Sequence, residues 1–147
     1  MTIGTIKELL EAEVLCGEDC LDVDVHSACG SDMMSDVLAY VKDQAVLLTG
    51  LVNSQVIRTA EMMDMVCLVF VRGKKPTQEM IELASDSGMA ILATDMCLYE
   101  ACGKLYVNGL VGNGRKLCNP HYGIRQCLQL RIARICVYGS KVRRTKK

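Results

Sequence analysis

Three short aliphatic runs, evenly spaced along the chain, constrain its fold more than any other feature. They end near Thr49, Val71 and Ala93, about 22 residues apart. Each run is continuously apolar, as in strands that are buried on both faces, and the segments between them have the length of helical crossovers. The pattern predicts an α/β fold: a small three-layer domain with about four parallel strands and flanking helices.

Helix start and stop signals fill the gaps between these runs. Small polar residues precede apolar residues at helical spacing, and Gly88 and Gly109 follow two of the segments. The expected helices, with their capping or starting residues in parentheses, are 2–12 (Thr2), one through Val41 (Ser31 or Asp32), one through Met63 (Asn53 or Ser54), one through Ser87 (Pro76 near its start) and one through Asn108 (Thr94 or Asp95).

Two further strands are expected earlier in the sequence than the three aliphatic runs. Residues 13–16 form a short apolar stretch, and residues 23–26 alternate between apolar and polar side chains, which is typical of a half-buried strand. The remaining expected strands are Ala45–Thr49, Val66–Val71 and Ala90–Ala93.

The charge of the chain divides it into two parts. Residues 1–112 contain all 17 acidic residues and 7 basic ones, whereas residues 113–147 contain 10 basic residues and no acidic one. The strand and helix pattern also ends near Gly112. We therefore predict an α/β domain over residues 1–112 and a basic tail over 113–147, with Cys118, Cys127 and Cys136, that is disordered or an addition to the domain.

The nine cysteines do not indicate a disulfide framework, because their number is odd and most lie in apolar runs. No secretory signal is recognisable, and no apolar run approaches the roughly 18 residues of a membrane helix. We expect buried free thiols in a cytoplasmic protein without membrane contact.

A binding site is expected where the parallel strands end, because ligands of open α/β sheets lie beyond the carboxyl ends of the strands. Glycines followed by helix starts offer backbone N–H groups there, and a basic corner adds positive charge. A nucleotide or a phosphorylated small molecule fits this chemistry, and tight turns with a solvated corner are the alternative. The candidate ligand-binding residues are Gly30, Ser31, Asp32, Thr49, Gly50, Asn53, Arg72, Gly73, Lys74 and Thr94.

Signals for catalysis and metal binding are weak. No phosphate loop of the Walker type is present, and His26 and Cys29 lack a third orienting group. Asp32 and Asp36 lie one helical turn apart, so they could form a paired-carboxylate or metal site. A helix cap at Asp32 and a solvated side chain at Asp36 explain the two residues better. No pair of cysteines has the Cys-x2-Cys spacing of a metal knuckle. We predict no catalytic residue, no metal and no cofactor, and the tail lacks a nucleic-acid reading motif.

Several segments between Ala28 and Leu110 resemble one known family. They are Ala28–Ala39 (ACGSDMMSDVLA), Leu47–Leu51 (LLTGL), Val56–Ala60 (VIRTA), Phe70–Pro76 (FVRGKKP) and Glu100–Gly103 (EACG). Together they are similar to the DRTGG domain family, although the string that names the family is absent. The resemblance implies an α/β fold that associates as a dimer. Similar domains accompany nucleotide-sensing CBS modules in some inorganic pyrophosphatases, where they look regulatory or dimerising, not catalytic.

Two functions remain after this reasoning. The first is a non-catalytic regulatory or ligand-sensing domain, a homodimer with a site for a nucleotide or phosphate compound at the strand ends. The second is a purely structural module for protein–protein interaction, with an unknown protein partner or a second copy. An enzyme would need a pocket that unites Asp32, Asp36, Cys29 or His26 with the basic corner at residues 72–75.

Overall fold

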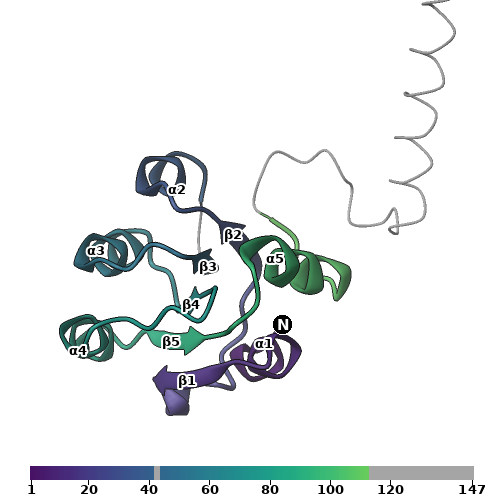
Figure 1. The fold of residues 1–147 in the computed structure, drawn as a ribbon, viewed down its shortest axis with the longest axis horizontal. Helices are drawn as coiled ribbons and strands as arrows, with labels where there is room; N and C mark the ends of the chain where they lie inside the picture. Colours follow the sequence, from purple (N-terminus) through teal and green to yellow (C-terminus); the bar gives the residue numbers. More distant parts are fainter. Residues whose placement is uncertain (42–43, 113–147) are drawn as a thin grey trace, which may run out of the picture. The chain divides into compact units, whose positions relative to one another are not determined.

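A five-stranded sheet forms the middle layer of the domain (Figure 1). The computed structural model describes residues 1–41 and 44–112, so the predictions for the basic tail lie outside the described residues. The strands are β1 (Glu13–Cys16), β2 (Ser27–Gly30), β3 (Ala45–Thr49), β4 (Cys67–Phe70) and β5 (Ala90–Ala93). The helices are α1 (Ile3–Leu10), α2 (Met34–Tyr40), α3 (Ser54–Met62), α4 (Gln78–Asp86) and α5 (Leu98–Val107), with a 3₁₀ turn at Glu18–Cys20.

The strand order is β1-β5-β4-β3-β2. Strands β2 to β5 are parallel, and β1 pairs antiparallel with β5, with a register irregularity between Val14 and Cys16. The predicted α/β architecture with four parallel strands is therefore confirmed, and the antiparallel edge strand β1 adds to it.

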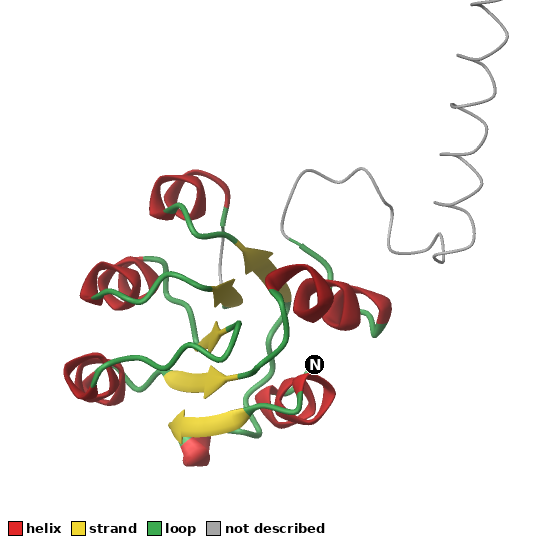
Figure 2. Ribbon diagram, viewed as in Figure 1, coloured by secondary structure: helices red, strands yellow, loops and turns green. Residues whose placement is uncertain are grey.

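Helices cover both faces of the sheet (Figures 1 and 2). Helices α1 and α5 lie on one face, and α2, α3 and α4 lie on the other. Along β3, Val46 and Leu48 belong to the core beneath α1 and α5, while Leu47 belongs to the core beneath the other three helices. Because both faces are covered, every residue of β3 is buried, which explains its continuous aliphatic sequence.

The strand predicted at residues 23–26 is wrong. In this segment only Asp24 forms a bridge, with Thr2, and the sheet strand starts at Ser27. Val25 is buried, and its N–H donates to the carbonyl oxygen of Met1 at 2.8 Å. The alternation therefore reflects a loop that packs one apolar side chain beside α1. The strand of this part of the chain is instead β2, which includes Ala28 to Gly30.

Helix caps follow the sequence signals in two cases: Thr2 caps α1 and Asn53 caps α3. Helix α4 starts near Pro76, as expected, and Thr77 caps it. The caps predicted for the other two helices are wrong. Helix α2 starts after Met33 and helix α5 after Cys97, neither with a side-chain cap. Two of the expected caps, Asp32 and Thr94, bond to other segments.

The outer edge of β2 is partly occupied. The N–H of Ala28 donates to the carbonyl oxygen of Val111 at 3.1 Å, so the chain after α5 runs beside this strand. No helix in the described ranges is long and apolar enough to span a membrane.

The six cysteines of the described residues are free thiols, as predicted. Their burial differs: Cys67 on β4 is fully buried, whereas Cys97 before α5 is exposed, so the expectation of buried thiols holds only in part. Burial raises the pKa of the Cys67 thiol far above its ordinary value.

Candidate functional site

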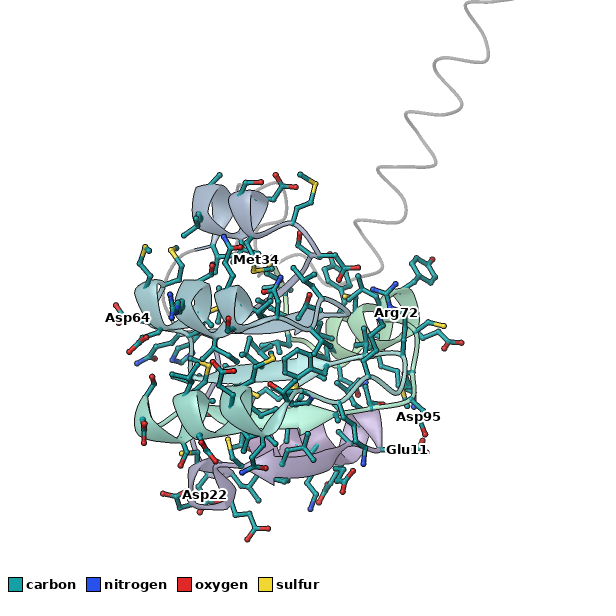
Figure 3. All side chains as sticks on the ribbon, turned by 60° about the vertical axis from the view of Figure 1, so that its left-hand side comes forward. Glu11, Asp22, Met34, Asp64, Arg72 and Asp95 are labelled. Atoms are coloured by element: carbon teal, nitrogen blue, oxygen red, sulfur yellow. The ribbon has the colours of Figure 1, made fainter. Side chains whose placement is uncertain are left out.

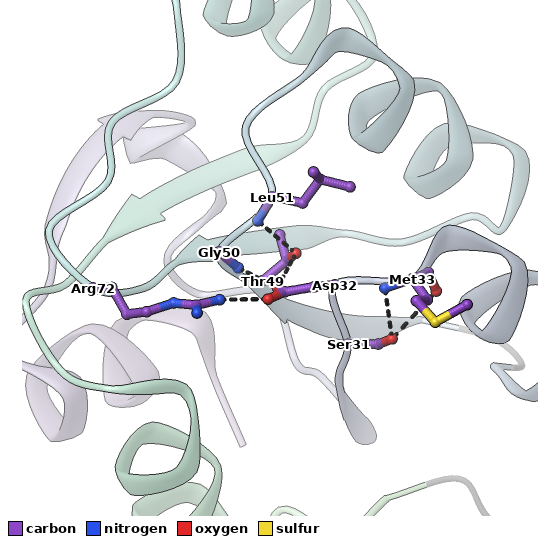
Figure 4. Close-up of polar contacts among 7 residues, drawn as sticks. All are labelled: Ser31, Asp32, Met33, Thr49, Gly50, Leu51 and Arg72. Carbon is purple, nitrogen blue, oxygen red and sulfur yellow. Dashed lines mark hydrogen bonds and ion pairs between the residues drawn. The ribbon is translucent and has the colours of Figure 1, made fainter.

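An ion pair between Asp32 and Arg72 joins two loops at the carboxyl ends of the parallel strands (Figure 4). Asp32 follows β2, and Arg72 follows β4. The other carboxylate oxygen of Asp32 accepts hydrogen bonds from the backbone N–H of Gly50 (2.7 Å) and the hydroxyl of Thr49 (3.1 Å). Residues from the ends of three strands therefore meet on one carboxylate.

The surroundings of Asp32 favour its ionised form. Partial burial raises the pKa of this carboxyl, but hydrogen bonds from the Gly50 N–H, the Arg72 guanidinium and the Thr49 hydroxyl outweigh it. The pKa of Asp32 therefore lies below its ordinary value. The ion pair itself is half-exposed, with 42% of the Asp32 side chain and 43% of the Arg72 side chain accessible.

Thr49 fixes the start of the loop after β3. Its side chain is fully buried. Its hydroxyl donates to Asp32 and accepts from the N–H of Leu51 at 3.1 Å. Because the hydroxyl both donates and accepts, the loop and the carboxylate are held in one arrangement.

Where the Arg72 guanidinium now lies, there is no room for a side chain at residue 50. The guanidinium of Arg72 lies directly over the Gly50 Cα, where a Cβ atom would overlap it. A side chain at residue 50 would therefore displace the guanidinium or the loop.

Arg72 and Gly73 both adopt the left-handed conformation, with φ of 65° and 63°. The N–H of Arg72 donates to the Met96 carbonyl (2.9 Å), and the N–H of Gly73 donates to the Thr94 carbonyl (3.0 Å). The loop after β5 therefore holds the loop after β4 in a conformation that costs an arginine about 1 kcal/mol or more.

The basic corner at residues 72–75 does not act as one cluster. Lys75 pairs with Glu13 on β1 at 2.7 Å, and this contact raises the pKa of Lys75. Lys74 is exposed. Of the three basic residues, Arg72 is the one whose side chain is tied to the Asp32 carboxylate.

Four of the ten predicted site residues make contacts outside the network around Asp32. Two of them, Gly30 and Ser31, are consecutive residues at the end of β2. Gly30 ends β2 under α5, where a Cβ would meet the Cys102 sulfur at 2.5 Å. The Ser31 hydroxyl bonds to the backbone of Met33 (3.0 and 3.2 Å). Neither residue contacts the Asp32 carboxylate.

The other two are Asn53 and Thr94. The Asn53 side chain accepts from the Val56 N–H at the start of α3 (3.1 Å). The buried Thr94 hydroxyl donates to the Leu10 carbonyl (2.7 Å). Both side chains therefore hold the fold at places where the sequence predicted ligand binding.

The structure brings together Asp32, Thr49, Gly50 and Arg72, with Gly73 beside them.

Sequence reasoning missed the role of the segment that follows Thr94. Asp95 lies next to Gly73, where an added Cβ would approach the carboxylate oxygen at 2.9 Å, and the Met96 carbonyl holds Arg72. Figure 3 shows Arg72 and Asp95 at the same edge of the domain, opposite Asp64, which precedes β4. No spacing signal links these residues, because they belong to separate loops.

The residues considered for catalysis are not assembled. His26 precedes β2 and Asp32 follows it, so they lie at opposite ends of that strand. Asp36 lies in the first turn of α2 and Asp32 precedes the helix, so the two carboxylates do not lie one turn apart on the same helix. Burial raises the pKa of the Cys29 thiol, with smaller contributions from Cys102 and Asp36. Within the described residues no three His, Cys, Asp or Glu side chains are grouped to hold a metal ion.

A surface hollow of about 650 Å³ lies along the outer side of α5, and its lining does not include Asp32. Its lining includes Met96, Tyr99 and Tyr106 and is mainly apolar. The polar network at the strand ends, by contrast, is a set of satisfied hydrogen bonds at a half-exposed rim. This network holds the Arg72 side chain in a fixed position, an arrangement that suits the binding of a ligand.

Comparisons with known proteins agree with this architecture. The model of the DRTGG domain family matches residues 5–105. Among solved structures, the CBS and DRTGG domains of the regulatory region of Clostridium perfringens pyrophosphatase, complexed with the activator diadenosine tetraphosphate, have a TM-score of 0.61 and 15% sequence identity to this chain. That alignment covers 90% of this chain and 59% of the solved chain, so this chain corresponds to little more than half of the regulatory region. No curated protein matches the chain.

Proposed function

Because the chain belongs to the DRTGG domain family, we propose that it is a non-catalytic regulatory domain that senses a nucleotide or another phosphorylated small molecule. The proposed site is the rim formed by the loops after the parallel strands. We further propose that the domain works as a homodimer.

The observation that carries this proposal is the fixed position of Arg72. Its guanidinium is held by Asp32, its backbone N–H by Met96, and it is still half-exposed. A guanidinium has five N–H donors in a rigid fork that matches phosphate oxygens, and Asp32 does not use them all. A phosphate group can therefore bind the outer side of Arg72, near exposed Lys74, while Asp32 remains in place.

The solved relative supports the choice of ligand class. Its regulatory region is complexed with a dinucleoside polyphosphate, an anion rich in phosphate oxygens. That region also contains CBS domains, and this chain covers 59% of it. The nucleotide is therefore a starting point for screening, and the site in this chain is argued from its own residues.

Calorimetric titration of the full chain with adenosine mono-, di- and triphosphate and diadenosine tetraphosphate tests the proposal. We expect one of these nucleotides to bind and to raise the melting temperature, since a ligand at 100 times its Kd adds about 2.7 kcal/mol of stability. Arg72→Gln should abolish this binding. Lys75→Gln, which removes a lysine paired with Glu13, is the matched control and should bind normally.

Two results would contradict the proposal. One is the absence of binding by every nucleotide in the panel. The other is binding that Arg72→Gln leaves intact, because the 10 basic residues of 113–147 would then account for it through charge alone. Circular dichroism of each variant shows whether the fold is retained.

A purely structural interaction module is the second candidate function. The observation in its favour is the apolar, exposed outer side of α5. Loss of self-association on changing this surface, together with no ligand in the titrations above, would favour this candidate.

A further inference from the structure

The outer side of α5 carries exposed apolar side chains. Tyr99 is 89% exposed, Val107 is 69% exposed and Tyr106 is 49% exposed. Of the eight large hydrophobic side chains that are exposed in the described ranges, four lie on α5 or at Val111 just after it. A contiguous exposed apolar patch of this kind marks an interaction surface.

Gly103 lies in the middle of this surface and has no explanation within the domain. A glycine inside a helix costs about 1 kcal/mol relative to alanine. A Cβ at residue 103 would meet nothing within 4 Å in residues 1–41 and 44–112, so no element of this part of the chain requires the glycine. A second helix that approaches closely would require it, because the missing side chain lets two backbones come together.

The side chains around Gly103 are self-complementary. With 3.6 residues per turn, Tyr99 and Tyr106 lie to one side of Gly103, and Glu100 and Lys104 lie to the other. Consider a second α5 packed antiparallel about a two-fold axis beside Gly103. When this axis passes between residues 102 and 103, Tyr99 of each copy is level with Tyr106 of the other, and Glu100 lies within one residue's rise of Lys104.

The charges on this face are available for such a contact. Lys104 donates to the Leu9 carbonyl at 3.3 Å and lies 3.5 Å from Glu11, contacts that hold its ammonium beside α1. An ammonium has three N–H donors, so Lys104 can also pair with a carboxylate from a second copy. Glu100 is exposed on the same face.

We propose that α5 is the contact surface between two copies of this chain, packed antiparallel with Gly103 beside the two-fold axis. The inference rests on the homodimer proposed above and is independent of the ligand site. A helix of 10 residues is about 15 Å long. This is short for the roughly 800 Å² per partner of a standard interface, so the dimer dissociates on dilution.

Sedimentation equilibrium of the full chain over a wide concentration range, with reductant to keep Cys97 reduced, tests the surface. We expect a reversible monomer–dimer equilibrium. Tyr106→Glu and Gly103→Leu should each raise the dissociation constant at least about tenfold, which corresponds to about 1.4 kcal/mol. Met62→Glu on α3, where the wild-type side chain is 71% exposed, is the matched control and should leave the equilibrium unchanged.

A charge reversal tests the two-fold arrangement directly. Glu100→Lys alone should weaken the dimer, because it places two positive charges near each other across the contact. Adding Lys104→Glu in the same chain should restore it, because each copy then presents the reversed pair; every chain of this series also carries Glu11→Gln, so that residue 104 no longer faces the Glu11 carboxylate. Rescue is expected only if the two residues face each other across the dimer.

The outcomes separate the surface from the homodimer. A dimer that survives both Tyr106→Glu and Gly103→Leu shows that the α5 surface is wrong while the homodimer stands. A wild-type chain that stays monomeric at every concentration contradicts both, and another occupant then covers α5. Charge reversal without rescue contradicts the antiparallel arrangement.

Discussion

Asp32 and Arg72, 40 positions apart in the chain, form an ion pair that connects the loop after β2 with the loop after β4. Its exposed geometry limits its contribution to stability, since half-exposed pairs are worth about 0–1 kcal/mol. Its value lies in fixing the guanidinium over Gly50. This arrangement and the burial around it lead to measurable consequences.

The left-handed conformation of Arg72 predicts an unusual order of variants. Both Arg72→Ala and Arg72→Gly lose the ion pair, but only glycine adopts φ of 65° without strain. We expect Arg72→Gly to be more stable than Arg72→Ala by about 1 kcal/mol in urea unfolding. Equal stabilities would contradict the strained conformation.

Asp32 predicts a loss of stability in acid. Its pKa is lowered in the folded protein, so its contribution is fully present above the unfolded value of 3.8 and is lost as the pH falls through the folded pKa. Urea unfolding of the wild type and Asp32→Asn between pH 7 and pH 3 measures this. We expect the gap in unfolding free energy to narrow as the pH falls, and a constant gap would be the contrary result.

Replacing Asp32 removes the carboxylate oxygen that accepts hydrogen bonds from the Thr49 hydroxyl and the Gly50 N–H. Asp32→Ala should cost about 1–2 kcal/mol because the Gly50 N–H loses its partner. Asp32→Asn keeps an oxygen that accepts from Gly50 and should cost less. Chemical denaturation at neutral pH ranks the two variants, and the reverse order would show that the negative charge matters more than the acceptor.

Substitution by alanine should have opposite effects on the unfolding free energy at Gly50 and at Gly103. Gly50→Ala places a Cβ into the Arg72 guanidinium and should lower the unfolding free energy. Gly103→Ala meets nothing among the described residues and should raise the unfolding free energy by about 0.5–1 kcal/mol through helix propensity. Thermal unfolding of dilute protein compares them, since dilution removes the effect of self-association on Gly103. A loss of stability in both variants would show that Gly103 is needed within its own chain.

Thiol reactivity should follow the burial of each cysteine. The fully buried Cys67, with its raised pKa, should resist alkylation in the folded protein, and the exposed Cys97 should react quickly. Mass spectrometry of peptides after timed labelling at pH 8 distinguishes the two sites. Rapid labelling of Cys67 without denaturant would show that β4 opens readily.

The sequence pattern was sufficient for the parts of the fold that depend on local preferences. The aliphatic runs predicted β3 to β5, and Thr2 and Asn53 were identified as caps because a cap acts within three residues. Asp32 and Thr94 have the same capping chemistry, yet they bond to Thr49, Gly50 and Leu10. Contacts between distant segments decided these two cases, and no local signal carries that information.

The candidate site was predictable in its location and not in its composition. Parallel strands place the loops that contain Asp32, Thr49, Gly50 and Arg72 at one edge of the sheet, as expected. The separation of Lys75 from this group depends on Glu13, which lies on the antiparallel strand β1. The four residues of β1 do not show from their sequence whether this edge strand runs parallel or antiparallel to its neighbour. The pairing of Lys75 with Glu13, away from Arg72, could therefore not be predicted.

The hydrogen bond from Ala28 to Val111 has a consequence for how the sheet meets other chains. An edge strand with unpaired backbone groups is a template for intermolecular β-pairing. At β2 the chain after α5 already binds one of these groups, the N–H of Ala28. A strand from another molecule must therefore displace that chain before it can pair with β2. Deleting residues after Leu110 would uncover that template, and such a truncated chain should aggregate through its sheet on storage.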